Sequence, residues 1–255
     1  MSSTTEHTQG ILVTLMQPQE HTQSSPKVLI IVPAYNEEAN ISAVVADLEK
    51  LPYDYVVIND GSKDKTPQIL DEIKACHVDL CRNLGIGGAV QTGYKYALEN
   101  NYDIAIQFDG DGQHDSGCIE RLVQPIIDGE ANMTIGSRFI CEENEFLSSR
   151  ARRAGITVLS NLIKLTTGQR IYDVTSGFRA VDRGIIADFA RSYPSDYPEP
   201  ESAACMIAGG RKVKEVGVIM HERQGGSSSI SAKSALYYMV KVGLSIILVR
   251  PYEKR

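Results

Sequence analysis

Short runs rich in β-branched residues alternate with segments of helical periodicity between residues 26 and 140. Parallel strands need a crossover between them, so this alternation predicts an α/β fold with a mostly parallel sheet flanked by helices. Ligands of open α/β sheets bind beyond the carboxyl ends of the strands, and we therefore expect functional residues in the turns that follow each strand. The predicted strands are 27–32, 55–59, 78–82, 103–108 and 132–135.

The second half of the chain completes a single predicted domain, residues 27–231. Its pattern predicts helices at 150–164 and 198–208, a turn rich in small and charged residues at 173–181, and a strand within 212–222. The segment before this domain, residues 1–26, has neither a basic region nor an apolar run long enough for a signal peptide. We interpret residues 1–26 as a disordered leader.

The C-terminal segment, residues 232–255, predicts an amphipathic helix. Its apolar stretch, 234–249, is shorter than the ~20 residues that span a bilayer. The helix either packs on its own domain or lies peripherally on a membrane, with Arg250, Lys254 and Arg255 near lipid head groups.

The net charge and the cysteine pattern limit which partners the protein can bind and in which cellular compartment it works. The net charge of -6 argues against a nucleic-acid partner. The scattered cysteines form no Cys-x-x-Cys pair, which argues against a zinc site or a disulfide framework and fits a reducing compartment. The sequence therefore predicts a cytoplasmic protein, peripheral on the inner face of the membrane if the C-terminal helix binds lipid, and leaves the oligomeric state open.

Polar turns follow the first two predicted strands. Pro33 is expected to end the first strand and to leave Tyr35 and Glu37 at the sheet edge, where they can stack on and hydrogen-bond a base. The alternative is that Asn36 or Glu37 only caps the next helix. Asp60 lies in a tight Asp-Gly turn after the second strand, where its carboxylate can accept hydrogen bonds from a base or ribose.

The turns after the third and fourth strands predict phosphate and metal binding. The glycine-rich segment 85–88 begins a helix and lets backbone amides approach phosphate or ribose. Asp109 and Asp111 are separated by one glycine in a turn, so both carboxylates can face one Mg²⁺ or Mn²⁺, with Gln113 as a third oxygen ligand. We interpret His114 as a partly exposed turn residue.

These motifs, in this order and spacing, resemble glycosyltransferase family 2. They are Val-Pro-Ala-Tyr-Asn-Glu at 32–37, Asn-Asp-Gly-Ser-x-Asp-x-Thr at 59–66 and Asp-Gly-Asp-Gly-Gln-His at 109–114. The resemblance covers residues 28–230 and implies the GT-A fold with its Rossmann-like sheet. It also implies a metal-dependent, inverting glycosyltransferase that uses a nucleotide-diphospho-sugar donor. The donor-binding residues it implies are Pro33, Ala34, Tyr35, Glu37, Asp60, Gly88, Asp109, Gly110 and Asp111.

The second half is similar to the dolichyl-phosphate-mannose-synthase branch of this family, through segments 135–138, 173–180 and 223–229. In that branch the acceptor is a polyprenyl phosphate, and arginines matching Arg138 and Arg223 engage phosphates. The chain departs from the branch at Ser228 and Ser229, where a lysine is usual, and it lacks the long membrane spans of many relatives. The expected acceptor is therefore either polyprenyl phosphate or a lipid-linked saccharide, in synthesis of a cell-surface polysaccharide or glycoconjugate.

The acceptor decides whether a base is needed. A phosphate is already anionic, whereas a sugar hydroxyl must lose a proton as it attacks. Asp173, Glu199 and Glu201 are candidates for that base, and Glu201 lies near the position of the base in other family 2 enzymes. Glu199 and Glu201 equally fit the role of first-turn helix charges.

Two other classes of protein are alternatives to a glycosyltransferase. A sugar-1-phosphate nucleotidyltransferase uses a related fold and a metal, but it would need a glycine-rich basic loop where residues 33–38 are acidic and free of glycine. A non-catalytic nucleotide-sugar-binding protein would not need Asp109 and Asp111.

Overall fold

A seven-stranded sheet forms the centre of the molecule, and its strand order is β3-β2-β1-β4-β6-β5-β7. The computed structural model describes residues 25–140, 150–221 and 232–248. β6 runs antiparallel to both of its neighbours, β4 and β5, and the other pairs are parallel. The strands are β1 (Val28–Ala34), β2 (Asp54–Asn59), β3 (His77–Asp79), β4 (Ile104–Gln107), β5 (Met133–Ser137), β6 (Arg179–Asp182) and β7 (Val213–Gly217).

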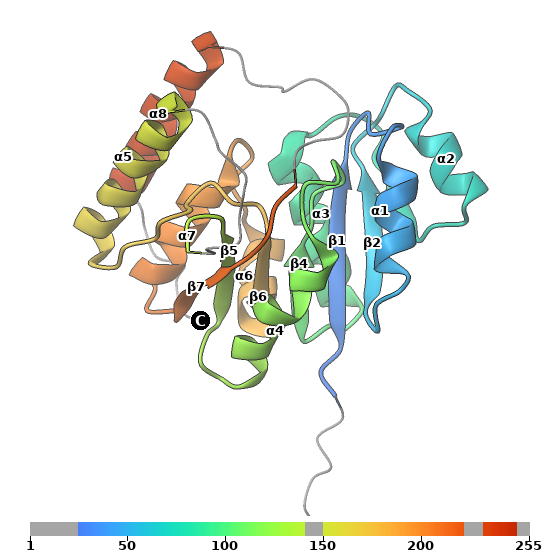
Figure 1. Cartoon of the computed structure of the whole chain (residues 1–255), viewed down its shortest axis with the longest axis horizontal. Helices are drawn as coiled ribbons and strands as arrows, with labels where there is room; N and C mark the ends of the chain where they lie inside the picture. The colour runs from blue at the N-terminus through green and yellow to red at the C-terminus, as the bar shows by residue number, and fades with distance from the viewer. Residues whose placement is uncertain (1–24, 141–149, 222–231, 249–255) are drawn as a thin grey trace, which may run out of the picture.

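Helices cover both faces of the sheet (Figure 1). One face is covered by α1 (Ile41–Leu48), α2 (Thr66–Glu72) and α4 (Ile119–Ile127), which follows the short helix η1 (Ser116–Cys118). The opposite face is covered by α3 (Gly85–Glu99), α6 (Arg183–Arg191) and α7 (Pro198–Ala208). On the same side, α5 (Arg150–Thr167) and α8 (Ala232–Ile247) pack on α7 and on each other. The mostly parallel α/β architecture predicted from the sequence is confirmed.

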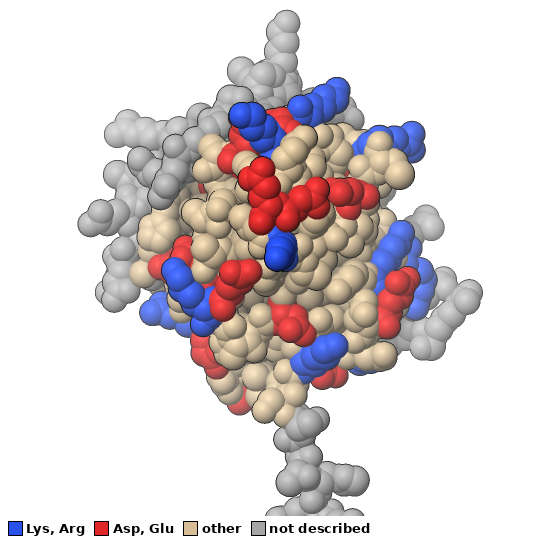
Figure 2. Space-filling view, turned by 90° about the vertical axis from the view of Figure 1, so that its right-hand side faces the viewer, with Lys and Arg blue, Asp and Glu red and all other residues tan. Residues whose placement is uncertain are grey.

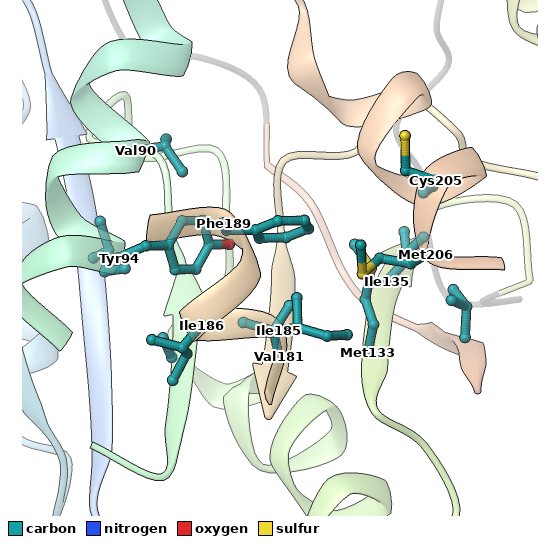
Figure 3. Close-up of a cluster of buried hydrophobic side chains, with 14 of the residues drawn as sticks. Val90, Tyr94, Met133, Ile135, Val181, Ile185, Ile186, Phe189, Cys205 and Met206 are labelled. Atoms are coloured by element: carbon teal, nitrogen blue, oxygen red, sulfur yellow. The ribbon is translucent and has the colours of Figure 1, made fainter. Parts of the chain in front are cut away.

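Two apolar clusters hold these layers together. Alternate residues of β1 point to opposite faces, so Leu29 and Ile31 join one cluster while Ile30 and Val32 join the other. Figure 3 shows the first cluster, in which side chains of α3, α6 and α7 meet those of β5 and β6. Within it Tyr94 and Phe189 pack with ring centroids 5.2 Å apart. The helices on this face are therefore held to the sheet by a close-packed apolar core.

Two local predictions were wrong. Pro33 does not end the first strand, because β1 continues through Ala34 and pairs there with Asn59 of β2. A proline is tolerated here because β4 pairs with β1 only as far as Ile31, so no ladder hydrogen bond from residue 33 is lost. The segment 173–181 is a turn only in its first part, since β6 begins at Arg179.

The predicted C-terminal helix is present as α8, and it packs on α5 and α7. Gly155 of α5 lies against Met239, and Gly243 of α8 lies against Leu162. Among the described residues, no helix is both long and apolar enough to cross a membrane. The cationic tail residues Arg250, Lys254 and Arg255 lie outside the described part of the chain, as does most of the predicted leader.

Because α3 and β1 are in close contact, we expect one added methyl group at Gly93 to lower the stability of the fold. A Cβ at Gly93 would lie 2.1 Å from Cγ2 of Ile31, a side chain with 0% exposure. We expect Gly93→Ala to lower the free energy of unfolding by about 1–3 kcal/mol through overpacking. Gly243→Ala is the matched control, because its Cβ would meet only Leu162 Cδ2 at 3.8 Å. That control should leave stability unchanged or raise it by up to ~1 kcal/mol. Equal urea midpoints for both variants would contradict the contact.

Candidate functional site

The carboxyl ends of the parallel strands and the start of β6 lie at one edge of the sheet. The register pairs Ala34 with Asn59, Gln107 with Arg179, and Ser137 with Gly217. Because β6 is antiparallel, the segment that precedes it, 173–178, also lies at this edge. Segments far apart in the sequence thus meet at the edge where ligands of open α/β sheets bind.

The turn after β1 is tied to the turn after β2. Asn36 Oδ1 accepts a hydrogen bond from the Lys63 amide at 2.8 Å, and the Glu37 amide donates to Thr66 Oγ1 at 2.9 Å. Asn36 has φ 56, a left-handed conformation that asparagine tolerates better than most residues. Pro33 and Ala34 are buried in β1, Glu37 is buried beside Asn40, and Tyr35 is exposed. The ring of Tyr35 is therefore available to a ligand.

Asp60 connects β2 to the start of α3. Its Oδ1 accepts the Leu84 amide at 2.7 Å and its Oδ2 accepts the Gly85 amide at 2.9 Å. Burial raises the pKa of this carboxyl, while the two amide hydrogen bonds oppose the shift. The Gly87 amide donates to the Ser195 carbonyl at 3.2 Å. Two amides of the glycine-rich segment, those of Gly85 and Gly87, are thus bound to protein acceptors, and Gly88 follows them in the first turn of α3.

The Asp109–Asp111 turn follows β4 at the middle of this edge. Gln107 Nε2 donates to Asp109 Oδ1 at 3.3 Å, and Asp111 Oδ1 accepts the Gln113 amide at 3.1 Å. The Gly110 amide donates to the Pro33 carbonyl, which joins the turn to β1. Asp109 and Asp111 are only half-buried, so both carboxylates reach the solvent side of the turn.

Gly177 makes room for the Asp109 carboxylate. A Cβ at residue 177 would lie 2.9 Å from Asp109 Oδ2 and 2.9 Å from Gln107 Nε2. Any larger residue would push the carboxylate away from its present position. The segment before β6 therefore shapes the acidic turn after β4.

His114 is buried, contrary to the interpretation of a partly exposed turn residue. Its ring stacks on Phe178 with centroids 4.7 Å apart, and residue 114 forms a bridge with Met220 beyond β7. Nδ1 accepts the Asp109 amide at 3.1 Å, which assigns the ring proton to Nε2, 3.6 Å from Asp109 Oδ2. Burial lowers the pKa of His114 to about 4, so the ring is neutral at pH 7. The ring positions Asp109 from behind the turn.

Arg138 and Asp173 form a buried ion pair. Arg138 donates from Nε and Nη2 to the two carboxylate oxygens of Asp173, each at 2.7 Å. The Asp173 side chain has 0% exposure, and the Arg138 amide also donates to Asp173 Oδ2 at 3.0 Å. The structure thus brings two of the predicted catalytic residues together as partners of each other.

Arg179 holds the segment that runs from Asp173 to the start of β6. Its guanidinium is 1% exposed and donates to the carbonyls of Val174 and Ser176 and to the Glu199 carbonyl. It also donates to Ser202 Oγ at 3.0 Å. The segment 173–180 carries the family resemblance, but no spacing or apolar pattern in it indicates that this arginine is buried.

The two glutamates at the start of α7 differ in surroundings. Burial raises the pKa of Glu199, while the positive charge of Arg179 opposes the shift; the negative charge of Asp109 adds to it. Glu201 is half-buried one residue before Ser202. Arg223, the remaining predicted site residue, lies outside the described residues.

The acidic turn offers oxygen donors of the kind that Mg²⁺ and Mn²⁺ prefer. Asp109, Asp111 and the side-chain oxygen of Gln113 are hard ligands, and Mg²⁺ is commonly held by one or two carboxylates together with substrate phosphates. Because Gly177 has no side chain, the Asp109 carboxylate can occupy its present position at the turn. Within the described ranges, no group of three or more His, Cys, Asp or Glu residues could by itself hold a metal ion.

Comparison with known proteins gives a consistent picture. The model of the family "Glycosyl transferase family 2" matches residues 29–189. UDP-N-acetylglucosamine--dolichyl-phosphate N-acetylglucosaminyltransferase of Methanococcus voltae is 34% identical over 71% of this chain and 79% of its own. Polyprenol monophosphomannose synthase of Mycolicibacterium smegmatis is 27% identical over 85% of each chain.

Solved structures resemble this fold at low sequence identity. Glucosyl-3-phosphoglycerate synthase from Mycobacterium tuberculosis, bound to Mn²⁺, UDP-glucose and phosphoglyceric acid, has a TM-score of 0.66 at 17% identity. That match covers 89% of this chain and 81% of the other. At this identity the likeness establishes the fold alone.

The buried ion pair predicts a large asymmetry between two charge-removing substitutions. Asp173→Asn leaves the Arg138 guanidinium buried without a counter-charge, so we expect the free energy of unfolding to fall by roughly 3–5 kcal/mol. Glu130→Gln is the control, since Glu130 pairs with Lys214 on the surface and should change stability little. Chemical denaturation measures both. A similar small change in the two variants would mean that the Arg138–Asp173 pair contributes little.

Proposed function

The chain belongs to glycosyltransferase family 2 and is a glycosyltransferase, and we propose that it transfers a sugar from a nucleotide-diphospho-sugar to a lipid phosphate with inversion at the anomeric carbon. The observation that carries the proposal is the Asp109–Asp111 turn at the carboxyl end of β4, seated against Gly177 and His114. Family membership leaves the nucleotidyltransferase and the non-catalytic binder without support.

The donor site extends from the turn after β1 to the turn after β4. We assign the base and ribose to Pro33, Ala34, Tyr35, Glu37 and Asp60, because these residues lie at the ends of the adjacent strands β1 and β2. Tyr35 offers an exposed ring for stacking, and Asp60 is an acceptor already oriented by two amides. Gly88 lies on the α3 side of this region, and Gly110 lets the acidic turn approach β1.

Asp109 and Asp111, with Gln113, would hold Mg²⁺ or Mn²⁺ against the donor diphosphate. Such a cation stabilises the negative charge that develops on the departing diphosphate. The neutral ring of His114 keeps Asp109 in place without adding a positive charge of its own. In the transfer, an acceptor oxygen bonds to the anomeric carbon while the bond from that carbon to the diphosphate oxygen breaks.

A phosphate acceptor fits the state of Asp173. This carboxylate is bound through both oxygens to Arg138, so we assign it the role of holding that arginine rather than of accepting a proton. Arg138 would then attract the acceptor phosphate at the end of β5, together with Arg223. The names of two curated relatives, which contain dolichyl phosphate and polyprenol monophosphomannose, support a lipid phosphate. Glu201 remains the candidate base if the acceptor is a saccharide.

The acidic turn predicts a selective loss of turnover. Asp111→Asn should reduce kcat at least ~100-fold, because a neutral amide is a weaker ligand for a hard cation, while the thermal midpoint stays within a few degrees. Asp115→Asn is the control in the same loop, since asparagine can keep the cap that Asp115 makes to the Gly117 amide at 2.8 Å. Release of nucleoside diphosphate measures both. Near-normal turnover of Asp111→Asn would remove the metal role.

The acceptor class can be tested with a panel of UDP-, GDP- and dTDP-sugars, Mn²⁺ and a short-chain polyprenyl phosphate. We expect the lipid phosphate to stimulate nucleoside diphosphate release from one donor and to form a lipid-phosphate sugar. In that case Glu201→Gln should retain turnover, because a phosphate needs no base. Release that ignores the lipid phosphate, together with inactive Glu201→Gln, would indicate a saccharide acceptor instead.

A further inference from the structure

Glu215 interrupts the apolar pattern of β7, a strand at the edge of the sheet. Val213 precedes it on the same face of the strand and belongs to the apolar core, and its register partner on β5, Ile135, is fully buried in that core. Residues two apart on a strand, and residues paired across strands, point to the same face. An apolar side chain is therefore expected at position 215, and the half-buried glutamate needs another reason to be there.

Both carboxylate oxygens of Glu215 bind the backbone of the segment that leads to Asp173. Oε2 accepts the Tyr172 amide and Oε1 accepts the Asp173 amide, each at 2.8 Å. Burial raises the pKa of Glu215, and these two amide hydrogen bonds oppose the shift. An ionised carboxylate supplies two acceptors at once, whereas the amide side chain of glutamine would set an N–H against one of the two backbone amides.

Asp173 links Glu215 to Arg138. The backbone amide of Asp173 binds Glu215, and its side-chain carboxylate binds Nε and Nη2 of Arg138 at 2.7 Å each. A shift of the Asp173 main chain would move this carboxylate, and the guanidinium would turn with it because the two bonds lie side by side. Glu215 thus acts on the orientation of Arg138 through Asp173.

Other contacts hold the same segment on both sides of the two amides that Glu215 binds. Gln169 Nε2 donates to the Val213 carbonyl at 2.7 Å, and Arg138 Nη2 donates to Thr175 Oγ1 at 3.2 Å. Loss of the Glu215 carboxylate should therefore shift the segment locally and leave the chain folded.

Glu72 of α2 offers a matched control for the removal of a glutamate charge. Figure 2 shows the flank around α1 and α2, where acidic and basic side chains are interspersed as on an ordinary solvated surface. Glu72 is exposed, so its replacement by glutamine exchanges one solvated side chain for another.

We propose that Glu215 is a positioning residue for the acceptor, because it holds the Asp173 main chain and thereby orients the Arg138 guanidinium toward the acceptor phosphate. The inference rests on the proposed function, which assigns that phosphate to Arg138, and extends it to a residue of β7. A negative side chain thus supports the binding of an anion, since its oxygens are directed at two backbone amides.

The experiment measures KM for a short-chain polyprenyl phosphate and, separately, for the sugar donor in the full chain and its variants. We expect Glu215→Gln to raise the acceptor KM roughly 10-fold, because one buried amide loses its acceptor, and to leave the donor KM unchanged. Charge alone predicts the opposite sign, since removing a negative charge near the site would favour an anionic acceptor. Glu72→Gln should change neither KM.

Two further variants separate positioning from a general loss of structure. Glu215→Asp keeps both carboxylate oxygens on a side chain one methylene shorter, and it should raise the acceptor KM less than Glu215→Gln does. Arg138→Lys should itself raise the acceptor KM, because lysine cannot form two parallel bonds to a carboxylate. In the Arg138→Lys background, Glu215→Gln should add little, since both changes act on the same orientation.

The outcomes distinguish this inference from the proposed function. An acceptor KM that falls in Glu215→Gln, a donor KM that rises equally, or a full additional effect in the Arg138→Lys background would overturn the positioning role. If Arg138→Lys raises the acceptor KM and Glu215→Gln does not, only the inference fails and the proposed function stands. If polyprenyl phosphate does not stimulate the unmodified chain, the proposed function is refuted, and the role of Glu215 with it.

Discussion

The guanidinium of Arg179 holds together the parts from which the candidate site is built. A buried arginine needs acceptors for its N–H groups, and here they are carbonyls of the segment before β6, the Glu199 carbonyl and Ser202 Oγ. That segment carries the partner of Arg138, the glycine beside Asp109 and the ring on which His114 stacks. The buried guanidinium of Arg179 therefore helps to position the Arg138–Asp173 ion pair, the Asp109–Asp111 turn and the first turn of α7.

The sheet carries these positions to the edge where chemistry takes place. β6 is the strand that reverses direction, and this reversal places the segment before it beside the turns that follow β4 and β5. With an all-parallel arrangement the same residues would lie at the opposite edge. The acidic turn is in turn connected to β1 through the Pro33 carbonyl and to the chain beyond β7 through the bridge between His114 and Met220. The site is thus supported from four strands rather than from one loop.

Sequence reasoning identified the alternating strands and the acidic turn because both depend on local signals, namely runs of β-branched residues and Asp-Gly pairs. It missed β6, since a four-residue strand that begins with a buried arginine has no apolar pattern at its start. It also misjudged His114, whose burial depends on Phe178 and Met220, far away in the sequence. Likewise the partnership of Arg138 with Asp173 follows from tertiary packing, which no spacing of residues predicts.

The N-terminus of α3 bears on how the protein can balance the negative charge of a bound diphosphate. A helix N-terminus is usually a ready binding site for phosphate, yet here the amides of Leu84 and Gly85 are bound by Asp60 and that of Gly87 by Ser195. The negative charge of Asp60 therefore already faces the positive end of this helix dipole. Under the proposed mechanism the donor diphosphate would then take counter-charge from the divalent cation that Asp109 and Asp111 would hold. Turnover in the cell would consequently follow the supply of free divalent metal as well as the supply of sugar donor.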